Sequence, residues 1–166
     1  LKLLFNKPGD HLMGNEIVFL IKALFFGLAA IIIIPKEFYK KYLLYGLFLG
    51  SLGDTGLTLL GKFLNLWKYK NMGVFNVLDL YSFWSPLAWM FVIMFFLYCL
   101  PLKRLVFYLY VACYGIFGYF VGLVLQNFDL YEYLGLFKYF APLVFTAWFY
   151  SVALIYLKAE GEKLEP

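Results

Sequence analysis

The sequence predicts an all-α polytopic membrane protein, in which residues 1–166 form one domain, a bundle of five transmembrane helices. Apolar residues make up 64% of the chain and charged residues only 14%, whereas a soluble domain carries about a quarter charged residues. Apolar stretches of about 20 residues, long enough to cross a bilayer as a helix, recur along the whole chain. Helices are expected rather than strands, because isolated strands would leave backbone groups unpaired in hydrocarbon.

The predicted spans are residues 16–34, 42–66, 83–100, 105–126 and 139–157. Pro35 and Pro101 follow the first and third spans, as expected where a helix stops. The first span has no small-residue cleavage pattern after it, so we expect a retained helix rather than a removed signal peptide.

The distribution of basic residues predicts an orientation. Five spans place the termini on opposite sides of the membrane. The side of the C-terminus holds seven basic residues: Lys36, Lys40, Lys41, Lys103, Arg104, Lys158 and Lys163. The other side holds five: Lys2, Lys7, Lys68, Lys70 and Lys138. Because cytoplasmic loops carry the excess of Lys and Arg, we expect the C-terminus in the cytoplasm and the N-terminus outside.

Two longer connections, residues 65–82 and 127–138, lie on the predicted outer side and mix aromatic residues with single acids. In one interpretation their Trp and Tyr side chains anchor the loops at the lipid headgroups. In the other, the loops form a cap over a cavity that opens outward.

Composition also excludes several classes of site. The net charge of +4 reflects loop lysines, so no nucleic-acid partner is expected. Cys99 and Cys113 fall within apolar segments and His11 is the single histidine, so we expect neither a metal site nor a cofactor. The chain also lacks nucleophile, zinc-protease and phosphate-loop motifs.

The second predicted span has a small, polar side. Its polar members, at helical spacings of three and four, are Ser51, Asp54, Thr55, Thr58 and Lys62, beside Gly46, Gly50 and Gly53. This side is expected to face protein or water, because lipid would leave Asp54 without a partner. Small residues here favour close helix packing.

Matching depths across the first two spans suggests partners for the charges. Lys22 lies three residues, about 4.5 Å, outward of the residue level with Asp54. Lys62 lies about 12 Å outward of Asp54 and matches the depth of Glu16. The sequence thus predicts the pairs Lys22–Asp54 and Glu16–Lys62. Two interpretations stay open, a structural brace and a functional intramembrane site.

The fourth predicted span contains a GxxxG pattern at Gly118 and Gly122. Small residues at this spacing let two helix backbones approach closely. The pattern predicts helix packing within the chain, and a homodimer face is the alternative.

The segment 42–104 resembles a family of small multi-pass bacterial membrane proteins that occur mainly in spore-forming Firmicutes. The similarity covers "YGLFLGSLGDTGLTLLGKFLNLW", the Trp67-x-Tyr69 pattern and "FWSPLAWMFVIMFFLYCLP". The chain is richer in Phe and Tyr than is typical of that family. The resemblance implies a bacterial cytoplasmic membrane and no assigned catalytic residues.

These observations favour a non-enzymatic accessory or scaffold subunit that packs against lipid, another membrane protein or itself through its Gly-rich faces. One alternative is a small transporter or channel component with Asp54 and Lys22 in a wet cavity. A second alternative is a membrane enzyme or carrier for a lipophilic substrate, with Asp54 as the acid or base.

Overall fold

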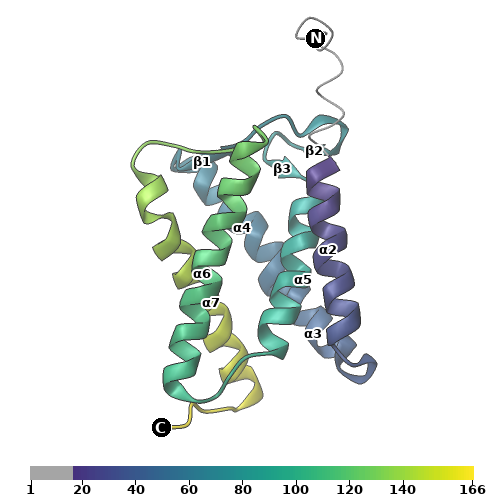
Figure 1. The fold of residues 1–166 in the computed structure, drawn as a ribbon, viewed down its shortest axis with the longest axis vertical. Coiled ribbons are helices and arrows are strands. Elements are labelled where there is room, and N and C mark those ends of the chain that lie inside the picture. The colour runs from purple at the N-terminus through teal and green to yellow at the C-terminus, as the bar shows by residue number, and fades with distance from the viewer. Residues whose placement is uncertain (1–16) are drawn as a thin grey trace, which may run out of the picture.

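The computed structural model describes residues 17–166, which form a helical bundle with short strands at one end (Figure 1). The α-helices are α2 (Ile17–Ile33), α3 (Tyr39–Tyr45), α4 (Leu52–Phe63), α5 (Trp84–Tyr98), α6 (Arg104–Asn127) and α7 (Phe137–Glu160). A π-helical segment, η2 (Gly46–Ser51), joins α3 to α4. The two 3₁₀ turns are η1 (Lys36–Phe38) and η3 (Gly73–Phe75).

Three helices are long and apolar enough to cross a membrane, namely Lys36–Phe63, Arg104–Asn127 and Phe137–Glu160. α2 and α5 are apolar but have only 17 and 15 described residues. At about 1.5 Å per residue they are shorter than the hydrocarbon core of roughly 30 Å. The helical architecture is therefore confirmed, and the structure supports three spans by length and composition. Five spans remain a prediction.

The helix bounds agree with the sequence at α6 and α7, where each end lies one to three residues from the predicted position. The second span differs most, because its helix begins at Lys36 instead of residue 42. Pro35 precedes η1 with φ −62°, and a proline preset near this angle suits the start of a helix. The segment that the sequence assigned to a loop is therefore the first part of the helix.

α5 is the central helix of the bundle. Ten of its fifteen residues are buried, and it packs against α2, α3, η2 and α4. A helix that is apolar all round is expected in such a buried position. Its contact with η2 is very close: a Cβ on Gly46 would lie 2.6 Å from the Met90 carbonyl oxygen, and one on Gly50 2.6 Å from that of Trp89.

The two long connections between helices contain short β-strands. β1 (Trp67–Tyr69) pairs antiparallel with β4 (Tyr131–Tyr133), so the two connections meet in one small sheet. β2 (Asn76–Val77) and β3 (Tyr81–Ser82) form a hairpin within the first connection. These strands have only two or three residues each, so the all-α class holds for the bundle and the sequence prediction lacked only these short strands. We call the end of the bundle with these strands the strand end, and the opposite end, where the chain terminates, the tail end (Figure 1).

The buried side chains form two clusters. Phe96, Phe107 and Phe149 belong to the cluster that extends to the tail end. Phe19, Trp67 and Leu130 belong to the cluster at the strand end. Many large apolar side chains outside these clusters are exposed, as on the α2 face with Leu24 and Phe25, which suits a surface in contact with lipid.

Candidate functional site

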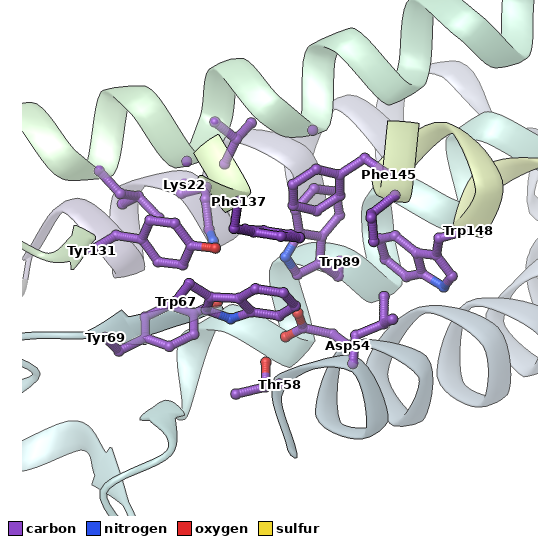
Figure 2. Close-up of a pocket in the computed structure, with 16 residues that line it drawn as sticks. Lys22, Asp54, Thr58, Trp67, Tyr69, Trp89, Tyr131, Phe137, Phe145 and Trp148 are labelled. Atoms are coloured by element: carbon purple, nitrogen blue, oxygen red, sulfur yellow. The ribbon is translucent and has the colours of Figure 1, made fainter. Parts of the chain in front are cut away.

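A cavity of about 30 Å³ lies at the strand end, beneath the β1–β4 sheet. Its walls come from α2, α4, α5, α6 and α7 and from both strands of the sheet. Lys22 and Asp54 point into it from different helices, and aromatic rings surround them (Figure 2). This volume has room for roughly two or three water molecules, since one water needs about 10–15 Å³ measured in this way.

Asp54 is the buried acid of the site. Its residue is only 6% exposed, and one carboxylate oxygen, Oδ2, has no hydrogen-bond partner among the described residues. The Ser85 hydroxyl interacts with the carboxylate. An unpaired buried carboxylate oxygen is costly, so it marks a position where a bound water or ligand group would be stabilising.

Ser85 connects the polar side chains of the site. It is fully buried in the first turn of α5. The Lys22 ammonium donates to its hydroxyl over 3.5 Å, and the Tyr69 and Ser85 hydroxyls are 3.1 Å apart. The N-terminal turn of a helix also favours nearby negative charge, which helps to stabilise Asp54 there.

Lys22 approaches the cavity from α2. Its ammonium lies 5.7 Å from the ring centroid of Phe19 and 5.8 Å from that of Trp89, distances at which aromatic faces attract cations. Lys22 and Asp54 attract each other electrostatically. No direct salt bridge joins them among residues 17–166, where the ion pairs lie elsewhere. The structure therefore brings the predicted pair to one cavity but separates the two charges.

Tyr69 supplies a second hydroxyl, which interacts with both Ser85 and Thr58. Burial and the neighbouring Asp54 carboxylate raise the pKa of Tyr69 well above its usual range. Its hydroxyl therefore stays protonated and available as a donor. Thr58 is only 3% exposed and lies one helical turn from Asp54 on α4.

The β1–β4 sheet closes the cavity because its two faces differ. Trp67, Tyr69 and Tyr131 line the cavity, while Lys68 and Glu132 alternate with them along the strands. Lys68 lies 3.1 Å and Lys70 2.8 Å from the Glu132 carboxylate, and Lys70 also lies 3.7 Å from Asp129. The hydrogen bonds from Lys70 and Lys68 lower the pKa of Glu132. The arrangement corresponds to the cap interpretation of the two connections.

The remaining predicted polar residues lie outside the cavity. Lys62 donates to the backbone carbonyl of Asp79 over 3.2 Å and so holds the β2–β3 hairpin against α4. Glu16 lies outside the described residues, so the Glu16–Lys62 pair has no structural counterpart here. The Ser51 carbonyl accepts a hydrogen bond from Thr55 and does not line the cavity.

The predicted packing glycines all face other parts of the same chain. Gly46 and Gly50 lie against the α5 backbone, and Gly53 faces the Trp148 indole. Gly118 packs against Phe145, and Gly122 against the Tyr133 hydroxyl. Gly118 and Gly122 also line the cavity, where the lack of a side chain leaves room for these rings.

An apolar groove open to the outside runs between α2 and α6, which stand apart in Figure 1. Its half nearer the strand end has a volume of about 330 Å³ and its other half about 430 Å³. Phe25, Phe26 and Phe117 line both halves. Lys22, Val121 and Leu125 line both the groove and the polar cavity, so only side chains separate the two spaces.

Sequence reasoning missed Ser85 and the residues that close the cavity. Trp67, Tyr69 and Tyr131 could have been found from the pattern, because aromatic and charged residues alternate in "WKYK" and in "YEY". Such alternation predicts a strand with one buried face. The opposite charges of Lys68 and Glu132 would then have suggested the pairing.

The chain matches no family model, no curated protein and no solved structure. Function must therefore be argued from the site alone. Among residues 17–166, no three His, Cys, Asp or Glu side chains are grouped so that they could hold a metal ion.

Proposed function

We propose that the protein is an integral membrane protein that binds a lipophilic molecule from the bilayer. The apolar part would lie in the groove between α2 and α6, with the polar end directed toward Lys22 and Asp54. One observation carries the proposal: Lys22, Val121 and Leu125 line both the apolar groove and the polar cavity. Binding sites of this kind are mostly apolar with a few polar groups that fix orientation.

The proposal includes five helices at membrane depth. The three longer helices would span the bilayer, and α2 and α5 would cross it within a locally thinner region or with help from flanking residues. The opening of the groove would then face lipid, because it lies beside the exposed α2 face that includes Leu24 and Phe25. We further propose the outward N-terminus and cytoplasmic C-terminus that the basic residues favour.

A small transporter or channel component is the second candidate. The free oxygen of Asp54 favours it, since buried intramembrane carboxylates often belong to ion or proton pathways. The accessory-subunit prediction stays a prediction. Its main support was the Gly-rich faces, and Gly46, Gly50 and Gly118 are covered by the chain itself.

Native mass spectrometry of the protein released from nanodiscs or mild detergent tests the proposal. We expect the wild-type chain to retain a lipophilic molecule. Val124→Trp should abolish retention because Val124 lines the groove. Ile116→Trp is the matched control: both positions lie on α6 and are 50% and 47% exposed, but Ile116 does not line the groove. Equal retention by the two variants would contradict the proposal.

A further inference from the structure

The site also indicates the chemistry of the polar end of the ligand. We propose that the ligand is a long-chain alcohol, with a single apolar tail in the groove and an uncharged hydroxyl group between Lys22 and Asp54. This inference rests on the proposed function and specifies its ligand. Charge balance, unused hydrogen-bonding capacity and size each contribute to it.

The charges of the site are already balanced. Lys22 and Asp54 together have no net charge, wherever the proton between them resides. The polar groups near them include the neutral hydroxyls of Ser85, Thr58, Tyr69 and Tyr131. A charged end group would leave a net charge at membrane depth, which is strongly unfavourable. An anionic or cationic lipid is therefore disfavoured relative to a neutral one.

The unused hydrogen-bonding capacity requires a group that both donates and accepts. Asp54 Oδ2 has no donor among the described residues. The Lys22 ammonium has three protons, and its hydrogen bond to Ser85 is long at 3.5 Å. A hydroxyl can donate to Asp54 and accept from Lys22. A ketone or ester carbonyl only accepts hydrogen bonds, so it would leave Asp54 Oδ2 without a donor.

The volumes of the cavity and the groove indicate which part of the ligand each can hold. The cavity of about 30 Å³ admits a water-sized group such as a hydroxyl, whereas a phosphate headgroup is much larger. The groove next to it is lined by apolar side chains apart from Lys22 and provides about 330 Å³ in its nearer half. A single apolar chain fits this shape, with its end at the side chains of Val121 and Leu125 that the two spaces share.

Three photoactivatable probes with the same hexadecyl chain test the inference: an alcohol, a carboxylic acid and an amine. Each is added to the full-length protein in phosphatidylcholine nanodiscs, and cross-linked peptides are mapped by mass spectrometry. We expect the alcohol to label the groove faces of α2 and α6 at least about tenfold more than either charged probe. Equal or stronger labelling by the acid or the amine would overturn the inference and leave the proposed function standing. No labelling of the groove by any probe would overturn both.

Two variants extend the test by changing the charge of the site. Asp54→Asn leaves Lys22 unbalanced, so the preference should move from the alcohol to the acid. Lys22→Gln leaves the charge of Asp54 unbalanced, so the preference should move from the alcohol to the amine. Glu162→Gln, in the exposed tail, is the matched control and should keep the wild-type preference. An unchanged preference in a folded Asp54 or Lys22 variant would overturn the inference. If neither variant folds, the wild-type comparison decides.

Discussion

The strand end and the tail end of the bundle are both rich in aromatic rings, yet they are built differently. At the tail end the rings contact one another directly: Phe96 lies 4.9 Å from Phe149 and 5.3 Å from Tyr110 between ring centroids, and the Tyr42 and Tyr156 hydroxyls pair at 3.1 Å. At the strand end rings also contact one another, as Trp67 and Phe137 do at 5.1 Å, but here Trp67 and Trp89 also stand around a cavity that contains two separated charges. The aromatic residues therefore fill space at both ends, and at the strand end they also enclose a cavity with two charges.

The two ends also differ in whether their buried polar atoms have hydrogen-bond partners. The Tyr42 and Tyr156 hydroxyls hydrogen-bond to each other, so each buried hydroxyl oxygen has a partner. Asp54 Oδ2 has no such partner among residues 17–166. A structure that only needed to fold would gain stability by filling this space with apolar side chains. The retained charges are the reason for assigning function to the strand end.

Breaking the charge balance of the strand end should have the largest effect. We expect Lys22→Gln and Asp54→Asn each to lower the free energy of unfolding by about 3 kcal/mol, because each leaves one buried charge uncompensated. The double variant should lose less than the sum of the two, since it removes both charges. Thermal unfolding in nanodiscs measures all three.

The control for this cycle is Lys62→Gln, which removes an exposed lysine whose hydrogen bond is to a backbone carbonyl. It should change the stability by no more than about 0.5 kcal/mol. Strictly additive effects of the Lys22 and Asp54 changes would mean that the two side chains are not coupled and that the cavity is not one site.

A second prediction concerns the close helix contact between the two ends. Gly46→Ala should destabilise the protein by about 1–3 kcal/mol through overpacking, because its Cβ would lie 2.6 Å from the Met90 carbonyl oxygen, which cannot move independently of α5. Gly56→Ala on the same long helix has no atom within 4 Å of the new Cβ. It should stabilise by about 0.5–1 kcal/mol through helix propensity. Equal melting temperatures for the two variants would contradict the packing assignment.

Sequence reasoning predicted the helices well because each is encoded locally. α6 and α7 carry long apolar runs with clear limits, and their bounds follow from those runs. The strands were missed because each has at most three residues and pairs with a distant segment. Trp67, for example, pairs with Tyr133, and helices α5 and α6 lie between them in the sequence. Such pairing depends on the tertiary fold and is not determined by local propensity.

The candidate site was found only in part, for a similar reason. Depth matching considered the first two spans as neighbours and placed Lys22 about 4.5 Å outward of the level of Asp54, within reach of its side chain. It did not include α5, whose first turn supplies Ser85 between them. A mid-membrane charge can be recognised in a sequence, but the hydroxyl that separates it from its partner depends on which third helix lies between them.

The smallest predicted effect concerns the ion pairs on the outside of the β1–β4 sheet. Because Lys70 and Lys68 lower the pKa of Glu132 below its ordinary value of 4.5, this carboxylate stabilises the sheet above pH 4.5. The contribution is lost as the pH falls through the lowered pKa of the folded state. Glu132→Gln should therefore speed amide hydrogen exchange in β1 and β4 at pH 7, and the difference between wild type and variant should shrink as the pH falls below 4.5.

Comparing the two proteins at the same pH removes the intrinsic pH dependence of exchange. Glu37→Gln is the control, since Glu37 is exposed near the tail end and forms no ion pair among the described residues; it should match wild type across the pH series. The effect should be small because partly exposed ion pairs contribute little. A difference between Glu132→Gln and wild type that stays the same size as the pH falls below 4.5 would mean that Glu132 acts through packing. The sheet would then be held closed by its aromatic face and not by its ion pairs.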